Sequence, residues 1–437
     1  MAEPHPPPGA ARGQGAWAYC LMPAIVMSLG WGLRGFIGGG PMGAMIPGAM
    51  IALLLCHLLE LDQRTSAFVA AFGAIGVGLG GQMTYGQTIG FIVQPETFSW
   101  GLLGLSVKGG IWGLLGGAVL GFGFIHQKMS RKSIGIAILL LVVGTLVGWK
   151  LINQPRLIYF SNPHDRPRAE IWAGLLLGAV VLLGYLSALG HGKIPWHFAL
   201  WGTMGGAIGF GGGGLWMALG KKLPEAKAWA SWWKLMELTF GFSFGLALGW
   251  AAWLRRGLIL SMQTKSSQQA EGFSFLASLL AALGLGGLAL WSDANVSIVW
   301  GFTTYGVILL AAAIVSEKIA WQVALTVTSS AFLLDLAETY LEEPSQNNIG
   351  LRITFVAITG LICGWIITRR ERAGKQMVRW SFLALMWLAM AVSFVKTFAH
   401  GELSPAHALV ELTFALQAII LTVFYLRQRG ATGTKLA

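Results

Sequence analysis

Apolar segments of about 20 residues recur along almost the whole chain, and short polar or glycine-containing stretches separate them. A helix of about 20 apolar residues is long enough to cross a bilayer core of about 30 Å. About fourteen such segments can be counted by this criterion, and they begin near Ala16, Met42, Ser66, Trp100, Ser133, Ile171, His197, Trp233, Phe273, Ser297, Ile319, Leu351, Trp380 and Ala406. The pattern predicts an all-α, polytopic integral membrane protein with about 14 transmembrane helices.

The composition excludes an ordinary soluble protein. Charged residues make up 11% of the chain and hydrophobic residues 55%, whereas a soluble domain has about 25% charged residues. The 61 glycines among 437 residues are typical of membrane helices that approach one another closely through small residues. Cys20, Cys56 and Cys363 lie singly inside apolar segments, so we expect buried thiols and predict neither a metal site nor a cofactor.

The net charge of +12 is carried by basic residues spread over short loops. This distribution indicates positive-inside topology rather than nucleic-acid binding. When both termini are placed in the cytoplasm, the cytoplasmic loops hold more Lys and Arg residues than the opposite loops. We therefore predict a cytoplasmic N-terminus and C-terminus, a location in the bacterial inner (plasma) membrane, and membrane lipids as partners.

The glycine content divides the chain into two helical parts. A flexible N-terminal tail, 1–15, precedes a glycine-rich bundle of eight helices, 16–256. A polar linker, 257–272, leads to a second bundle of six helices, 273–426, and to a basic C-terminal tail, 427–437.

The first bundle contains matching segments that suggest a duplicated unit. Residues 74–81 match 207–214, and a later set of glycines at four-residue spacing matches another set: Gly109, Gly113 and Gly117 with Gly241, Gly245 and Gly249. These matches predict a parallel repeat of a four-helix unit, 16–132 and 133–256, of the kind that frames many transporter sites. The alternative is chance similarity between glycine-rich helices that pack closely.

The stretch Gly30–Gly48 joins the first two apolar segments and contains Arg34 among eight glycines and two prolines. Irregular backbone is tolerated at membrane depth only where protein or water satisfies its polar groups. We therefore expect irregular backbone here, with Arg34 holding an anionic group beside free backbone N–H groups. The alternative is that Arg34 extends to the lipid headgroups.

Further candidate residues lie near the same predicted membrane face. Gln82, Thr84 and Tyr85 follow the glycines of the third segment, and Lys108 lies about 12 Å inside the fourth at 1.5 Å per residue. The repeat alignment places Glu237 at a similar depth, so we expect Lys108 and Glu237 to face one interior as an ion pair, with Lys234 nearby. Lys108 and Glu237 serve ion coupling on one interpretation and lock two helical units together on the other.

The remaining candidates are weaker. Asp335 and Glu411 lie in apolar surroundings of the second bundle, and an intramembrane carboxylate is a candidate functional group. The loop 153–170 contains His164 beside Asp165 and several arginines, which suits acid–base chemistry, but a solvated loop is the simpler interpretation. No nucleotide-binding, hydrolase or metalloprotease motif occurs in a suitable context.

These residues favour a multi-pass transporter or flippase-like carrier of an anionic or amphipathic substrate. Its outward-facing cavity would be lined by the Arg34 break, the glycine-rich helices, Lys108 and Glu237. The alternatives are a membrane-embedded transferase that acts on a lipid-linked substrate at the outer face, and a structural subunit of a membrane complex. No motif decides between transport and catalysis.

Overall fold

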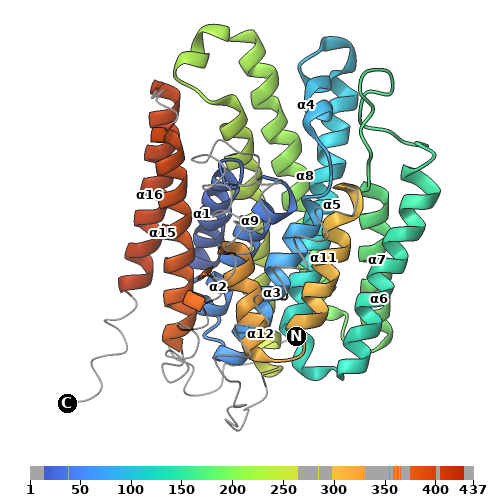
Figure 1. Cartoon of the computed structure of the whole chain (residues 1–437), viewed down its shortest axis with the longest axis vertical. Coiled ribbons are helices and arrows are strands. Elements are labelled where there is room, and N and C mark those ends of the chain that lie inside the picture. The colour runs from blue at the N-terminus through green and yellow to red at the C-terminus, as the bar shows by residue number, and fades with distance from the viewer. Residues whose placement is uncertain are drawn as a thin grey trace, which may run out of the picture.

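The computed structural model describes residues 14–37, 39–263, 284, 298–329, 354, 358–359, 361–363, 365, 375–399 and 404–427. This part of the chain is helical and contains no strand (Figure 1). Its helices are α1 (Ala16–Arg34), α2 (Gly40–Leu58), α3 (Gln63–Gly80), α4 (Gly86–Ile92), α5 (Phe98–Ile125), α6 (Arg131–Gly148), α7 (Trp172–Ala188), α8 (Lys193–Lys222), α9 (Trp232–Ser261), α11 (Ile298–Ala313), α12 (Glu317–Trp321), α15 (Lys375–Ala399) and α16 (Pro405–Arg427). Short 3₁₀ turns η1 (Pro95–Thr97), η2 (His126–Lys128) and η4 (Pro224–Ala228) and π-helical turns η3 (Trp149–Asn153) and η5 (Gln322–Val327) extend several of them.

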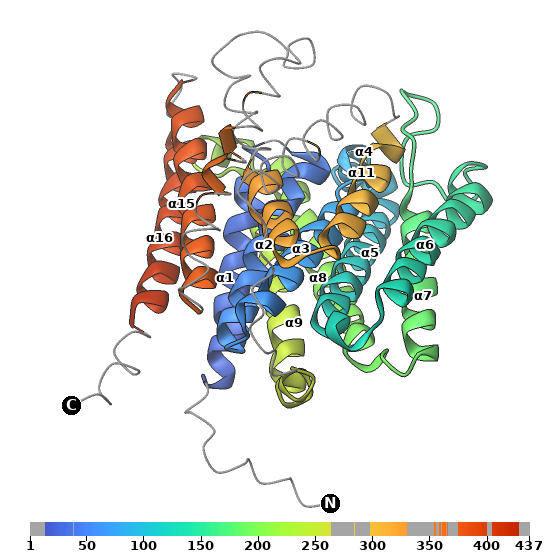
Figure 2. The same cartoon turned by 60° about the horizontal axis from the view of Figure 1, so that its bottom comes forward.

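Helices of the first half form the centre of the bundle. The helix α5 packs along α8, α9 packs along both α1 and α8, and α3 packs between α2 and α5. The α6–α7 hairpin lies at one side and the α15–α16 pair at the other, while α11 and α12 cover α3 (Figures 1 and 2). The eight buried Asp, Glu, Lys and Arg side chains of the described part include four on the central helices: Arg34, Lys108, Lys234 and Glu237.

Seven of the described helical segments are long and apolar enough to cross a membrane: α1, α2, η1 with α5 and η2, α6 with η3, α9, α15 and α16. The outer helices also present large apolar side chains to their surroundings. Leu139 on α6 is 60% exposed and Leu412 on α16 is 65% exposed, with further apolar residues one turn away on each helix. Apolar faces of this extent are unfavourable in water and suit lipid contact, so the chain is an integral membrane protein with several spans. The full count of fourteen spans stays a prediction.

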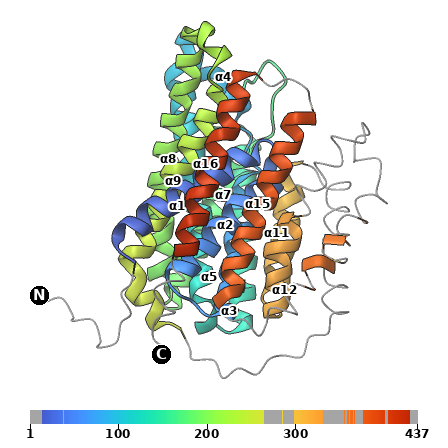
Figure 3. The same ribbon diagram turned by 90° about the vertical axis from the view of Figure 1, so that its left-hand side faces the viewer.

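The first and last described helices begin and end at the same end of the bundle. Trp17 near the start of α1 contacts Phe424 near the end of α16, with 6.1 Å between ring centroids. We name this the lower end, and the end that carries α4 and the α8–α9 turn the upper end (Figure 3). Ends on one side agree with the predicted placement of both termini on one membrane face, while the orientation in the membrane stays a prediction.

The glycines at four-residue spacing are contact surfaces between helices. A Cβ atom at Gly113 of α5 would lie 1.8 Å from the carbonyl oxygen of Gly202 in α8, and one at Gly249 of α9 would lie 1.8 Å from that of Tyr19 in α1. The two matched sets therefore both allow close packing, but against helices that the proposed repeat does not equate. The four-helix duplication consequently stays a prediction.

The break between the first two spans is shorter than the sequence suggests. Helix α1 continues to Arg34 and α2 begins at Gly40, so the expected irregular backbone over Gly30–Gly48 is wrong for most of that range. Gly30 lies against Pro47, and Gly48 lies against α3, because both serve helix packing. Only the short turn between the helices is irregular, and Gly39 and Gly40 there have φ angles of 50° and 47°, which favour glycine.

The boundaries in the second half are only partly described. Helix α9 continues to Ser261, so the first residues of the predicted linker, 257–261, are helical. Helices α11, α15 and α16 pack on α3, α2 and α1, respectively. The division into two bundles stays a prediction, and Asp335 lies outside the described residues.

Candidate functional site

Arg34, at the last position of α1, points into the protein at the upper end and is 3% exposed. Its guanidinium carbon lies 5.4 Å from the ring centroid of Trp31, 5.7 Å from that of Tyr85 and 5.3 Å from that of Trp112. The Nη1 group donates to the Tyr85 hydroxyl at 2.8 Å, and Nε donates to the Gly40 carbonyl at 3.4 Å. The alternative in which Arg34 extends to lipid headgroups is therefore wrong.

The aromatic cage around Arg34 consists of Trp31, Tyr85 and Trp112. Within the described residues the cage holds a cation without a counter-ion, because the two ion pairs found there join other residues. A cation over an aromatic face gains about 0.5–2 kcal/mol per contact, whereas an unpaired charge at membrane depth costs several kcal/mol. Gly39, Gly40 and Gly86 border the cage, and a Cβ atom at any of them would meet nothing within 4 Å. The charge balance of the described residues therefore leaves Arg34 with an uncompensated positive charge.

Lys234 and Glu237 form an ion pair on α9 beside the cage. The Lys234 Nζ lies 2.6 Å from the Glu237 Oε2 and donates at 3.0 Å to the Gly32 carbonyl near the end of α1. The Glu237 Oε1 accepts from the Trp233 indole at 3.0 Å, and Trp233 stacks on Tyr85 with 6.1 Å between centroids. A side chain at Gly35 would collide with both charged groups, which explains the glycine directly after Arg34.

Lys108 has a different partner from the one expected. Its Nζ lies 2.8 Å from the Glu170 Oε1 and also donates to the Thr84 carbonyl at 2.6 Å and to the Thr88 hydroxyl at 2.9 Å. Glu170 accepts in addition from Ser161 and from the Phe160 backbone and Trp172 indole N–H groups. The predicted Lys108–Glu237 ion pair is therefore wrong, because a nearer carboxylate enters from the loop 153–170.

Thr84 and Tyr85 connect the two charged clusters. The Thr84 carbonyl accepts from Lys108, while the next residue, Tyr85, binds Arg34. The helix α4 that follows is held under the loop by its own polar residues: Gln87 donates to the carbonyls of Asp165 and Arg166, and Thr88 donates to the Phe160 carbonyl. The turn η1 follows α4 and leads into α5.

The predicted residues therefore gather at one end but in a closed arrangement. Lys108 and Glu237 are 1% and 2% exposed, so an outward-facing cavity that reaches them is absent from the described part of the chain. Gln82 is buried and accepts a hydrogen bond from Thr303 on α11 instead of lining a cavity. Thr84 is half-buried, and its hydroxyl donates to the Ala169 carbonyl at 3.4 Å.

Glu411 lies apart from the cage, between α15 and α16. Its Oε1 accepts from Ser393 at 3.0 Å and from Thr397 at 2.8 Å. Its Oε2 is buried and has no partner in the described structure. Glu411 is consequently a buried carboxylate without a cationic partner in the part of the chain that the structure describes.

The loop 153–170 is partly solvated, as the simpler interpretation expects. His164 and Asp165 are exposed, and their backbone N–H groups donate to the Asn162 side chain. Burial raises the pKa of Tyr159, whose hydroxyl donates to the Arg168 carbonyl at 2.7 Å. The rest of the loop includes three buried residues, Phe160, Ser161 and Glu170.

Sequence reasoning missed three residues of this site. Trp31 lies one helical turn before Arg34, so the spacing i, i+3 already placed the two on one face. Trp112 lies one helical turn after Lys108, so the same spacing argument places these two residues on one face of α5. Glu170 is the last polar residue before an apolar segment, and a lone lysine at membrane depth requires a carboxylate of this kind.

Comparison of the chain with protein-family models, with curated proteins and with solved structures gives no match. The interpretation of the site therefore depends on its geometry.

Proposed function

We propose that the protein is a membrane carrier for an anionic small molecule or an amphipathic molecule with an anionic group. The observation that supports this proposal is Arg34, a buried cation that aromatic rings surround and no described carboxylate neutralises. An anion beside the guanidinium would supply the missing charge and form charge-assisted hydrogen bonds. On this proposal the closed arrangement is an occluded state of the carrier, and transport requires the upper end to open.

The neighbouring ion pairs support the same assignment of roles. Lys108 and Lys234 are each neutralised by a carboxylate, so neither supplies free positive charge. Of these three buried cations, Arg34 is therefore the one whose charge an anionic ligand would neutralise. The glycines beside it carry no side chain that could cover the backbone there, and a Cβ atom at Gly39, Gly40 or Gly86 would meet nothing within 4 Å.

Two other functions compete with transport. A transferase would use the loop residues His164 and Asp165, but both are exposed and lie outside the buried cluster. A structural subunit would have a closed interior of the kind seen here, in which Arg34 serves packing alone. Measurement of uptake separates a carrier from a structural subunit.

Uptake into proteoliposomes tests the proposal. The full-length protein is reconstituted, and accumulation of radiolabelled phosphate, sulfate, acetate and glycerol 3-phosphate is compared between wild type and Arg34→Gln. We expect uptake of at least one anion by wild type and a loss of about tenfold or more in the variant, since one charge-assisted interaction is worth about 1.5–3 kcal/mol.

Arg168→Gln is the matched control, because it removes an exposed arginine from the upper loop. This control should transport like wild type. Equal uptake by wild type and Arg34→Gln, or no uptake of any probe by wild type, contradicts the carrier proposal.

A further inference from the structure

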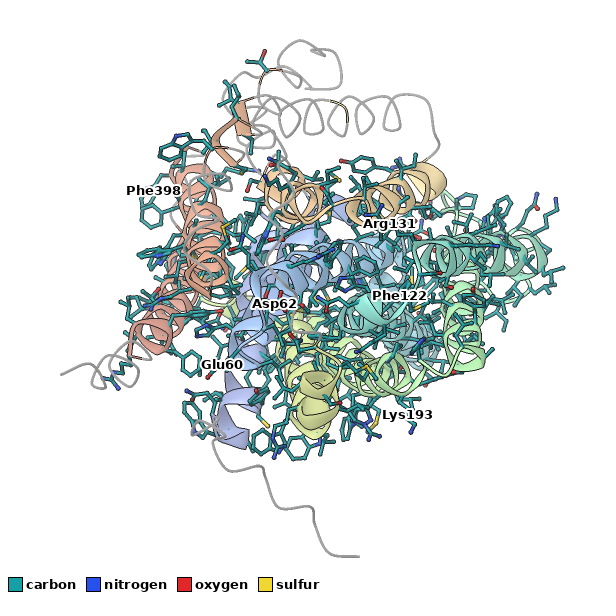
Figure 4. The ribbon with its side chains drawn as sticks, turned by 90° about the horizontal axis from the view of Figure 1, so that it is seen from below. Glu60, Asp62, Phe122, Arg131, Lys193 and Phe398 are labelled. Atoms are coloured by element: carbon teal, nitrogen blue, oxygen red, sulfur yellow. The ribbon has the colours of Figure 1, made fainter. Side chains whose placement is uncertain are left out.

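A cavity of about 290 Å³ lies at the lower end of the bundle, away from the Arg34 cage. Its wall comes from the start of α3, from η2 and the start of α6, and from the turn between α11 and α12. Figure 4 views the molecule from this end and shows Arg131 beside the helices of the second half. The residues that form the wall are Arg64, Phe68, His126, Gln127, Met129, Arg131, Ile134, Ile314, Val315 and Ser316.

The polar part of the wall is positively charged. Arg64 is the second residue of α3, and Arg131 is the first residue of α6. Both helices have 18 residues, and the N-terminal end of a helix carries a partial positive charge. An arginine at such an end gains nothing from the helix dipole, so an anion bound between Arg64 and Arg131 would be favoured. Arg131 donates at 3.2 Å to the Val315 carbonyl, which fixes its position at the cavity.

The acidic residues next to this cavity in the sequence lie outside its wall. Asp62 caps α3, because its Oδ1 accepts from the Thr65 backbone and its Oδ2 accepts from the Thr65 hydroxyl. Neither Asp62 nor Glu317 belongs to the cavity wall. Gln127 donates to Thr65, and His126 is buried against Phe68 with its Nδ1 against the Gly123 carbonyl. The wall therefore has an excess of positive charge.

The other part of the wall is apolar and reaches the lipid-facing surface. Ile134 and Ile314 line the cavity, and Val315 at its edge is 52% exposed. The cavity lies where the predicted spans end: α5 with η2 ends at Lys128, and α6 begins at Arg131. Lipid headgroups occupy this depth, and basic pockets between transmembrane helices bind anionic headgroups.

We propose that this cavity binds the phosphate group of an anionic phospholipid, with Arg64 and Arg131 as its ligands. The apolar edge formed by Ile134, Ile314 and Val315 receives the first part of the acyl chains. A volume of about 290 Å³ lies at the lower limit of small-molecule sites, which are about 300–1,000 Å³. The cavity therefore suits a headgroup and excludes a whole lipid.

Native mass spectrometry of the full-length protein in detergent tests this proposal. Binding of phosphatidylglycerol is compared with binding of phosphatidylcholine of the same acyl chains, for wild type and for the double variant Arg64→Ala/Arg131→Ala. We expect wild type to prefer phosphatidylglycerol and the double variant to lose about tenfold or more of that affinity, because each charged hydrogen bond to phosphate is strong.

The control variant Lys193→Ala/Arg255→Ala removes the same charge from exposed residues that do not line the cavity. Lys193 lies on the other side of the lower end from Arg131 (Figure 4). The control should bind phosphatidylglycerol like wild type. Equal losses in both double variants, or no loss in either, overturn the proposal.

A competition arm separates a lipid from a soluble phosphate compound. If glycerol 3-phosphate or inorganic phosphate displaces phosphatidylglycerol at comparable concentration, the lipid source is overturned and a soluble phosphate compound takes its place. Failure of both to compete supports the lipid. Melting temperatures of all variants confirm that they are folded, and the Ile134→Asn variant, which keeps both arginines, should weaken lipid binding without affecting free phosphate.

Discussion

Arg34 and Lys108 are two buried cations at the same end of one membrane protein, and they differ in how their charges are compensated. Lys108 has a carboxylate at 2.8 Å, a carbonyl and a hydroxyl as partners. Arg34 has three aromatic rings, one hydroxyl and one long contact to a carbonyl. A lysine whose charge and donors are satisfied is a structural group, whereas an arginine with neither a counter-ion nor full hydrogen bonding is suited to a ligand.

The largest expected effect comes from Glu170→Gln. This change leaves the Lys108 charge buried without its partner, and breaking a buried pair in this way costs about 3–5 kcal/mol of folding free energy. The melting temperature of the purified protein in detergent should fall strongly. The double variant Lys108→Met/Glu170→Gln should recover much of the loss, since removal of both charges leaves no isolated ion. An unchanged melting temperature for Glu170→Gln contradicts a structural pair.

An intermediate effect is expected from Glu237→Gln. Glu237 is 2% exposed and binds both Lys234 and the Trp233 indole. Lys234 keeps the Gly32 carbonyl and the face of the Phe36 ring as partners, so the loss should be about 1–3 kcal/mol. Thermal unfolding measures it, and Glu225→Gln, an exposed acid in η4, is the control. If Glu237→Gln lowers stability as much as Glu170→Gln does, the two ion pairs contribute equally to folding, which contradicts the expected difference.

The smallest effect on stability is expected from Arg34→Met. The variant removes an unpaired buried charge, and replacement of buried charge by an apolar side chain is often neutral or stabilising. The melting temperature should stay the same or rise, while stabilisation by added anions should disappear. If Arg34→Met lowers the melting temperature as much as Glu170→Gln does, Arg34 is a packing residue. Arg34 and Lys108 would then both have structural roles.

The sequence predicted the helices better than their contacts. The expected starts at Ala16, Met42 and Trp100 lie within two residues of α1, α2 and α5, because the length of apolar segments depends directly on bilayer thickness. Six of the candidate residues gather at the upper end, since charge at membrane depth must be buried in protein: Arg34, Thr84, Tyr85, Lys108, Lys234 and Glu237.

The partners could not be read from the pattern. The alignment of spans predicts a pair between Lys108 and Glu237. In the structure a polar loop places Glu170 next to Lys108 instead. Periodicity describes one helix at a time and gives no information about a loop that folds back over the helix ends. For the same reason the aromatic cage, which joins α1, α5 and the segment before α4, was visible only in part.

The adjacency of Thr84 and Tyr85 ties the two charged clusters together mechanically. The Thr84 carbonyl oxygen accepts a hydrogen bond from Lys108, and the next residue, Tyr85, provides the ring that covers the guanidinium. A movement of Tyr85 that exposes Arg34 would therefore disturb the Lys108 contact at Thr84, and Lys108 is in turn bound to Glu170 of the loop 153–170. The Lys108–Glu170 ion pair thus helps to hold Tyr85 over Arg34, and a weaker pair would leave the guanidinium less well covered.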